Sequence, residues 1–186
     1  MQLFLRSCYQ TTSAGAGRET SLLFEMNTLF EEYVGRLITR ALARTEYRVS
    51  LQGGRLFCLT SLDDERAVFQ AKPDILIWRA GQVVHVIDTK WKRNPSRIDD
   101  RKQGVSQGDV YQMMAYAHLY KAPRPTLLYP HQQDLSGSEG LQAQFRISGQ
   151  ETIIDAASVN VASGVDIVAR LKRLLEARPK EVMSAG

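Results

Sequence analysis

Apolar residues recur at helical spacing in the segment that begins at Thr28. They return every three or four residues as far as Leu42, the repeat that places side chains on one face of an α-helix. The run Thr28-Leu-Phe-Glu31 also fits a capping box, in which the side chains of Thr28 and Glu31 satisfy the first backbone groups of a helix. The pattern therefore predicts a helix that starts at Thr28. Its apolar positions are Leu29, Phe30, Tyr33, Val34, Leu37, Ile38, Ala41 and Leu42.

Four short runs with strand character follow this helix. Tyr47–Gln52 and Arg55–Thr60 flank a glycine pair, which is typical of a hairpin turn. Val68–Trp78 and Val83–Asp88 are rich in β-branched residues and are joined by a tight turn at Ala80-Gly81. The sequence thus predicts two hairpins, the second of them an antiparallel pair.

The second half of the chain alternates between helical and strand patterns. After a polar stretch without periodicity, residues 92–109, a second helix is expected over Asp109–Tyr120. Thr126–Tyr129 is a short strand candidate, and Gln142–Ile147 alternates like a half-exposed strand. A last helix is expected from Ser163 to Arg178. This order predicts an α/β domain with a mixed central sheet flanked by helices.

Composition is ordinary for a globular protein. The 186 residues are 44% hydrophobic and 24% charged, enough for one domain with a buried core. No apolar run approaches the roughly 20 residues of a membrane-spanning helix, and the first residues do not resemble a signal peptide. Cys8 and Cys58 match no metal-binding spacing and are interpreted as free thiols in a reducing cytoplasm. We expect residues 1–20 to form an irregular lead-in and residues 21–186 a single domain.

Candidate chemistry is concentrated in Lys72-Pro-Asp74 and Asp88-Thr-Lys90. Two carboxylates on neighbouring strands can hold Mg²⁺, which polarises a phosphate and lowers the pKa of its bound water. Lys90 lies two residues beyond Asp88 and therefore points to the same face, where it can orient the nucleophile or balance developing charge. Thr89 is expected to point away, with its backbone carbonyl as a further metal ligand.

The same residues also have a purely structural interpretation. Asp74 can be a turn residue, Asp88-Thr-Lys90 a solvated strand end, and such patterns arise by chance in many proteins. Their placement favours a site, because Asp74 opens one apolar strand and Asp88 closes the next. A hairpin turning at Ala80-Gly81 brings both carboxylates to the same end. We therefore predict metal-dependent phosphodiester hydrolysis at Asp74, Asp88 and Lys90.

Gln112 and Tyr116 form a second feature, on the helix that follows the polar stretch. They lie one helical turn apart and therefore share a face. A solvated pair would have the same spacing. A helix placed directly after the two strands can lay this face along the scissile strand.

Together, these motifs resemble the RecB-type branch of the PD-(D/E)XK nucleases, in which a PD…DxK pair is followed by QxxxY. More narrowly, the chain is similar to McrC, the nuclease-subunit family of the McrBC modified-cytosine restriction system. The similarity extends over about residues 20–180. It is carried by Phe24–Glu31, Lys72–Ile77, Val86–Lys92, Asp109–Tyr116 and Leu127–Pro130.

The resemblance implies a restriction-endonuclease-like core and a Mg²⁺-dependent DNA endonuclease, with Mn²⁺ as a substitute metal. It also implies a McrB-like, GTP-driven AAA+ partner that recognises methylated DNA. Asp74 and Asp88 match the metal ligands of the family and Lys90 its catalytic lysine. Gln112 and Tyr116 match the QxxxY pair.

Glu31 matches the acidic residue on the first helix of the family, where it binds the metal or its water. The capping box gives it an alternative, structural role. McrC proteins usually carry a large N-terminal region that docks onto the translocase. Here about 20 residues precede the motifs, so the expected domain corresponds to the C-terminal part of such proteins.

Two groups of basic residues are possible phosphate contacts in a chain of net charge +4 and pI near 9.2. The first is a stripe at i+4 spacing that is more often a solvated helix face: Arg36, Arg40, Arg44 and Arg48. The second follows Lys90 directly and is the better DNA-binding candidate: Lys92, Arg93, Arg97, Arg101 and Lys102.

A rival class remains, a nuclease-like fold that binds DNA or an AAA+ partner without cutting. The intact triad Asp74, Asp88 and Lys90 argues against such a degenerate site. No phosphate-binding P-loop and no Ser/His or Cys/His nucleophile pattern is present, so nucleotide hydrolysis is not expected in this chain.

Overall fold

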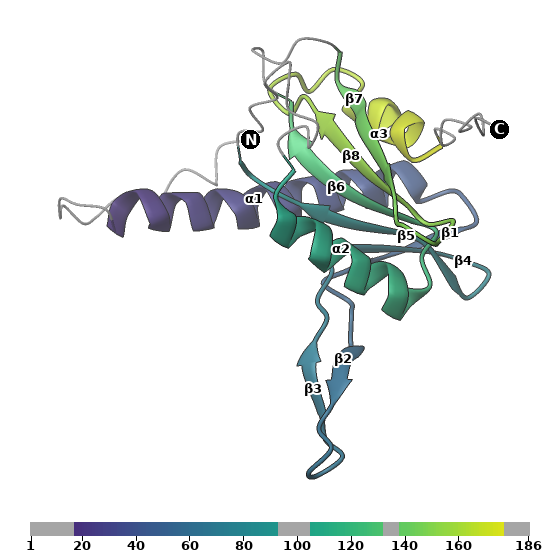
Figure 1. Cartoon of the computed structure of the whole chain (residues 1–186). Helices are drawn as coiled ribbons and strands as arrows, with labels where there is room; N and C mark the ends of the chain where they lie inside the picture. The colour runs from purple at the N-terminus through teal and green to yellow at the C-terminus, as the bar shows by residue number, and fades with distance from the viewer. Residues whose placement is uncertain (1–16, 93–104, 132–137, 177–186) are drawn as a thin grey trace.

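The computed structural model of the chain describes residues 17–92, 105–131 and 138–176 (Figure 1). Its centre is a six-stranded sheet in the order β1-β4-β5-β6-β8-β7, with β5, β6 and β8 parallel and the other pairs antiparallel. The strands are β1 Tyr47–Leu51, β4 Ile75–Arg79, β5 Gln82–Thr89, β6 Arg124–Pro130, β7 Gly140–Arg146 and β8 Ile153–Val159.

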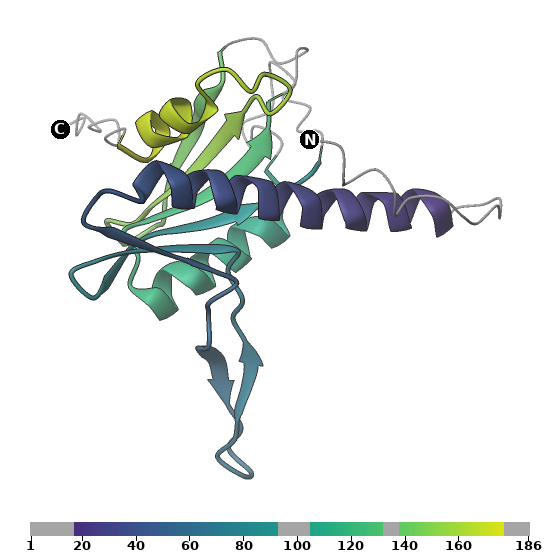
Figure 2. The same cartoon turned by 180° about the vertical axis from the view of Figure 1, so that it is seen from behind.

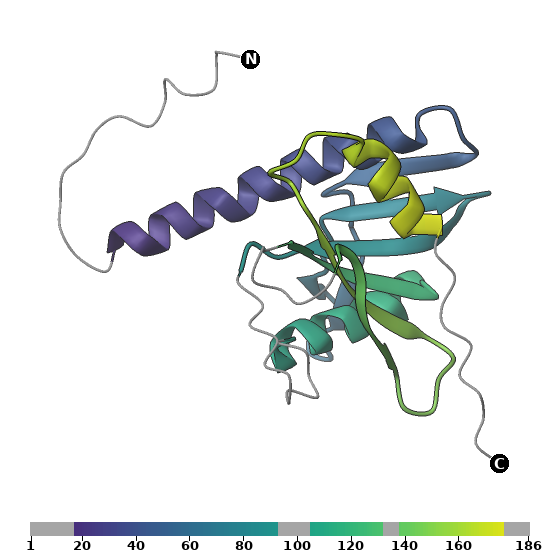
Figure 3. The same cartoon turned by 90° about the horizontal axis from the view of Figure 1, so that it is seen from above.

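Helices cover both faces of this sheet (Figures 1 and 3). Helix α1 (Gly17–Leu42) and helix α3 (Ile167–Glu176) pack on one face, and α2 (Gln107–Tyr120) packs on the other. The mixed sheet between helices confirms the predicted α/β fold class and is compatible with a restriction-endonuclease-like core. No described helix is long and apolar enough to cross a membrane.

The alternation of side chains along β4 and β5 divides the core into two halves. Leu76 and Val86 pack with α2, whereas Ile75 and Ile87 pack with α1 and α3. Because side chains alternate with period two, residues two positions from Leu76 or Val86 share the α2 face. The predicted site residue Asp88 stands at such a position, and Asp74 lies one residue before β4 begins. The turn between the strands is as predicted, with left-handed backbone at Ala80 (φ 49°) and Gly81 (φ 79°).

The first predicted hairpin is wrong. Strand β1 pairs with β4, Leu51 opposite Ile75, while β2 (Phe57–Thr60) pairs with β3 (Ala67–Gln70). The predicted strand Val68–Trp78 is interrupted because Pro73 has no N–H for a sheet ladder. Strand β4 therefore begins at Ile75, as a strand separate from β3, and pairs with β1.

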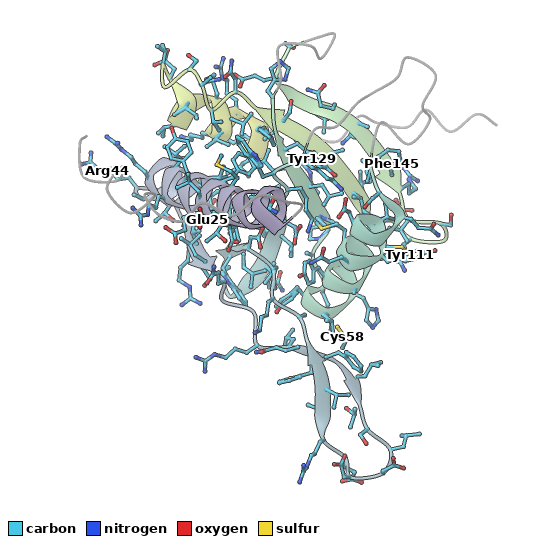
Figure 4. All side chains as sticks on the ribbon, turned by 90° about the vertical axis from the view of Figure 1, so that its left-hand side faces the viewer. Glu25, Arg44, Cys58, Tyr111, Tyr129 and Phe145 are labelled. Atoms are coloured by element: carbon cyan, nitrogen blue, oxygen red, sulfur yellow. The ribbon has the colours of Figure 1, made fainter. Side chains whose placement is uncertain are left out.

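Strands β2 and β3 instead form a ribbon that projects from the body of the molecule (Figures 1 and 2). Gly54 lies where the two legs of the ribbon come together. A Cβ there would lie 2.5 Å from Pro73 Cδ and 2.8 Å from the Ala71 carbonyl oxygen, so glycine is required by the close approach rather than by a turn. Cys58, on the ribbon, is free and exposed, as predicted for this thiol (Figure 4).

Two helices begin at other residues than predicted. Helix α1 begins at Gly17, so Thr28 lies inside it and the predicted capping box does not form. The structural alternative for Glu31 thereby falls away, and residues 17–20 belong to a helix rather than to an irregular lead-in. Residues 1–16 lie outside the described part. Helix α3 begins at Ile167, not at Ser163.

Strand β8 escaped prediction altogether. It lies between β6 and β7 and is buried over most of its length. A strand covered on both faces has no alternation of polar and apolar residues to reveal it. Its one acidic residue, Asp155, accepts hydrogen bonds from Arg124 on β6 (Nε to Oδ2, 3.1 Å) and from Gln144 on β7 (2.8 Å).

His85, on β5 near this ion pair, makes folding stability depend on pH. Burial, with the nearby charge of Arg124, lowers the pKa of His85 from 6.5 to about 4. Below pH 6.5 this histidine is protonated in the unfolded chain but still neutral in the folded chain, so the stability of the fold decreases as pH falls toward 4. We expect a loss of about 2 kcal/mol between about pH 7 and about pH 5.

Urea denaturation of the wild type and of His85→Leu at both pH values measures this contribution. The stability difference between the two proteins should shift by that amount in favour of the variant at low pH. A difference that stays constant with pH would show that His85 titrates normally.

Candidate active site

The two predicted acidic residues meet at one end of the β4–β5 pair. The register Ile75 opposite Ile87 brings Asp74, just before β4, next to Asp88 near the end of β5. Asp74 Oδ2 accepts two hydrogen bonds from Thr89, from its backbone N–H and from its hydroxyl, both 2.7 Å. Asp88 is 1% exposed. Burial and the negative charge of Asp74 raise the pKa of Asp88 to about 6, and burial also raises the pKa of Asp74.

Lys90 reaches the same point from just beyond β5. Its Nζ lies 2.6 Å from Asp88 Oδ2 and donates to Gln112 Oε1 at 3.0 Å. Its backbone N–H donates to the Leu128 carbonyl at 2.9 Å, so this end of the strand stays fixed to β6. Burial opposes the charge on Lys90, but the attraction of Asp88 outweighs it and the pKa of the ammonium is raised. The site therefore contains a permanently charged ammonium group.

Helix α2 supplies the partner of this lysine. The helix is capped by Ser106, whose hydroxyl accepts from the Asp109 N–H at 3.2 Å. One turn apart on its inner face, Gln112 Nε2 donates to the Tyr116 hydroxyl at 2.8 Å. Tyr116 is 5% exposed, and burial raises its pKa to about 12, so the phenol is neutral. Tyr116 is thus buried and Gln112 half-buried, and Gln112 connects Lys90 to Tyr116.

Glu31 approaches from α1, on the side of Asp74. Its Oε1 accepts a hydrogen bond of 2.8 Å from Gln52 Nε2. Burial raises the pKa of Glu31, the bond from Gln52 opposes this, and the charge of Asp74 adds to it. Glu31 and Asp74 share a pocket of about 250 Å³. Its lining residues are Glu31, Glu32, Arg36, Leu51, Gln52 and Asp74.

Two residues at this site differ from, or are missing from, the sequence-based prediction. The side chain of Thr89 does not pack elsewhere, because its hydroxyl holds Asp74. Asn27 was not predicted; its Oδ1 accepts from the Trp91 N–H at 2.8 Å and fastens α1 to the end of β5. The Phe30 and Trp91 rings stack edge to face beside it, 5.5 Å apart. Asn27 lies in Phe24–Glu31, the first of the segments similar to McrC, so the family resemblance could have pointed to it.

A second residue that was not predicted is Asp109, which forms an ion pair with Lys92 and lies 4.0 Å from Lys90 Nζ. Lys92 also lies 5.8 Å from the ring of Tyr129, a buried residue of β6 (Figure 4). The ammonium of Lys92 thus has partners within the protein, although its side chain is partly exposed. The other predicted DNA-binding residues lie outside the described part of the chain: Arg93, Arg97, Arg101 and Lys102.

The donor set suits a hard divalent cation. Within the described ranges, no three His, Cys, Asp or Glu side chains lie close enough together to hold one metal ion. Mg²⁺, however, is commonly bound through only one or two carboxylates and keeps several waters. Asp74 and Asp88 provide such a pair, and a cation would relieve the repulsion that raises the pKa of Asp88. These residues therefore fit Mg²⁺ or Mn²⁺.

Comparisons with known proteins place the chain. No curated protein matches it. Among solved structures, it is similar to a chain in the half-complex from the tetradecameric assembly of Thermococcus gammatolerans McrB AAA+ hexamers with bound McrC. The TM-score is 0.57 with 18% sequence identity, over 81% of this chain and 33% of that chain. This likeness supports the fold. The present chain spans about a third of the length of the chain that it matches.

A family match carries the assignment further. The family described as McrBC 5-methylcytosine restriction system component matches residues 1–130, which include α1, β1 to β6 and α2. The match contains every predicted site residue of the preceding paragraphs, from Glu31 to Tyr116. The chain therefore belongs to the family of McrBC 5-methylcytosine restriction system components.

Proposed function

We propose that this chain is the DNA-cleaving part of a McrBC-type restriction system, a Mg²⁺-dependent endonuclease that hydrolyses phosphodiester bonds. The observation that carries the proposal is the convergence of Asp74, Asp88 and Lys90 at one end of β4 and β5. A solvated strand end would not bury Asp88 to 1% exposure or hold its lysine between two partners.

Each residue has a task in such a reaction. Bound Mg²⁺ would supply Lewis acidity toward the phosphate and a more acidic water. Asp74, held by Thr89, and Asp88 provide its carboxylate ligands, with the Thr89 carbonyl as a further one. The ammonium of Lys90, fixed by Gln112, balances the negative charge that develops on the phosphate in the transition state.

Glu31 and Tyr116 complete the proposed site from either side. Glu31 and Asp74 line the same pocket. There the Glu31 carboxylate would bind a metal-bound water or the metal itself. Tyr116 stays neutral and holds the amide of Gln112, which in turn accepts from the Lys90 ammonium, so this pair on α2 orients the lysine toward the scissile strand. These roles rest on the placement of the side chains around Asp74 and Lys90.

We propose a McrB-like AAA+ GTPase as the partner, working with this chain in the cytoplasm. Support comes from the family match and from the similar structure, an assembly of McrB AAA+ hexamers with bound McrC. Phosphate contacts position a protein but carry no sequence information. Selectivity for modified cytosine is therefore assigned to the partner.

Plasmid cleavage tests the proposal. Purified protein should nick or cut plasmid DNA with Mg²⁺ or Mn²⁺ and do nothing in EDTA. Methylated and unmethylated DNA should be cut alike by the chain alone and differently when the AAA+ partner is added. DNA binding without cleavage under all these conditions would favour the rival function, a nuclease-fold module that only binds.

Neutralising the basic residues of the polar stretch beyond Lys92 should weaken DNA binding and flatten its salt dependence. The variant carries alanine at Arg93, Arg97, Arg101 and Lys102. Each phosphate contact that is lost lowers the slope of log affinity against log salt by about 0.9 on duplex DNA. Fluorescence anisotropy over a salt series measures the slope.

The exposed residues Arg40, on α1, and Arg44, in the turn just after it, provide the control, because they are also arginines and lie outside residues 93–102. The double variant Arg40→Ala, Arg44→Ala should keep the wild-type slope. A slope that falls only in this control would assign the DNA contacts to Arg40 and Arg44 instead of to residues 93–102.

A further inference from the structure

Gln52 has an unusual backbone for a residue with a long side chain. It directly follows β1 and has a φ of 48°, in the left-handed region that favours glycine. The chain has glycines at the next two positions, yet the left-handed conformation is at the glutamine. Non-glycine residues in this region cost stability and are retained where surrounding structure or function demands them.

The side chain and the backbone of Gln52 connect two elements of the candidate site. Its Nε2 donates to Glu31 Oε1 on α1 at 2.8 Å, and its N–H donates to the Asp74 carbonyl at 2.8 Å. All three residues line the same pocket. Helix α1 and the start of β4 are thus connected through one residue.

Stability does not explain this arrangement. Gln52 is exposed, and the bond to Glu31 is a surface hydrogen bond. Such bonds contribute little net stability, because water competes for both partners. The unfavourable backbone therefore has no packing gain to offset it. Its remaining effect is to aim the amide at Glu31.

We propose that Gln52 is a positioning residue, which holds the Glu31 carboxylate toward Asp74 so that Glu31 takes part in binding the metal or its water. The proposal rests on the proposed nuclease function. It assigns a task to a residue outside the PD…DxK and QxxxY motifs. Groups that orient metal ligands typically change metal affinity or activity by 10- to 100-fold when removed.

Two variants of Gln52 separate its amide from its backbone. Gln52→Met keeps a side chain of similar length but removes the donor. Gln52→Gly removes the donor and also relieves the left-handed backbone. Both should lower Mn²⁺ affinity, measured by calorimetry without DNA, and slow cleavage by about tenfold or more. Gln52→Gly should melt no lower than the wild type.

Ala80→Gly is the matched control. Ala80 has nearly the same φ, 49°, and lies at the opposite end of β4 from Asp74. This variant should also melt no lower than the wild type, with unchanged Mn²⁺ affinity and cleavage. Equal losses of Mn²⁺ affinity in Ala80→Gly and Gln52→Gly would overturn the proposal, because the change in backbone strain alone would then explain the loss.

A double-mutant cycle with Glu31→Gln decides whether Gln52 acts through Glu31. Gln52→Met should lower Mn²⁺ affinity in the wild-type background and have no further effect in Glu31→Gln. Equal effects in both backgrounds, or no effect in either, would overturn the proposal. Absence of cleavage by the wild type would instead contradict the proposed function, while the Mn²⁺ cycle still decides the role of Gln52.

Discussion

Asp88→Asn should abolish metal-dependent cleavage and at the same time stabilise the fold. A neutral amide is a poor Mg²⁺ ligand, although its shape is nearly that of the carboxylate. In the wild type, burial and Asp74 raise the pKa of Asp88 to about 6, so the folded chain holds its proton more tightly than the unfolded chain. The stability from that proton is present below about pH 4 and is lost as pH rises through 6.

Asparagine has no proton to lose, so the variant avoids this loss at neutral pH. The gain has an upper limit of about 3 kcal/mol, since one pKa unit corresponds to 1.36 kcal/mol. Calorimetric Mn²⁺ titration, plasmid cleavage and thermal melting measure the three effects. Asp74→Asn should likewise lose cleavage and metal affinity. Cleavage at the wild-type rate in either variant would exclude its aspartate as a metal ligand.

Lys90→Ala should slow cleavage by about 30- to 1000-fold while leaving Mn²⁺ affinity nearly intact. Its ammonium stabilises charge that appears only in the transition state, an effect of roughly 2–4 kcal/mol for comparable donors. Single-turnover cleavage at saturating DNA isolates this step. An unchanged rate with weaker DNA binding would instead make Lys90 a simple phosphate contact.

The same variant should be less stable than the wild type. Lys90 is the ion-pair partner of Asp88, at 2.6 Å, and its removal leaves a buried carboxylate without its cation. The double variant Lys90→Ala, Asp88→Asn should recover the stability but not the activity. Urea denaturation of the four proteins measures the coupling, and stability changes of the two single variants that simply add in the double variant would contradict it.

The carboxylate pair was predictable because its determinants are local. The alternation through Asp74 and Leu76, the tight turn at Ala80-Gly81 and the alternation through Val86 and Asp88 all lie within a short segment. Together they determine which face each side chain takes and which end of the hairpin it occupies. The spacing of Gln112 and Tyr116 placed them on one helix face, and the family resemblance added Glu31; the catalytic roles of these residues stay predictions.

What escaped prediction depends on contacts between distant segments. Nothing near Tyr47–Leu51 indicates that this strand pairs with β4 rather than with its sequence neighbour. The largely apolar run Ile153–Val159 would fit a buried helix as well as a buried strand, so its pattern does not identify it as a strand. At Gln52, the hydrogen bonds to Glu31 and to Asp74 join segments that are distant in the sequence, and a glutamine gives no hint of them or of its left-handed backbone.

The ribbon formed by β2 and β3 is an insertion between two strands that already pair with each other. Leu51 stands opposite Ile75 whatever the chain does between them, so the register that places Asp74 beside Asp88 does not depend on the ribbon. Lengthening a flexible connection costs little, about 0.6 kcal/mol for each doubling. Evolution can therefore exchange this appendage without rebuilding the core, and an engineer can graft a reporter or a new recognition element at its tip.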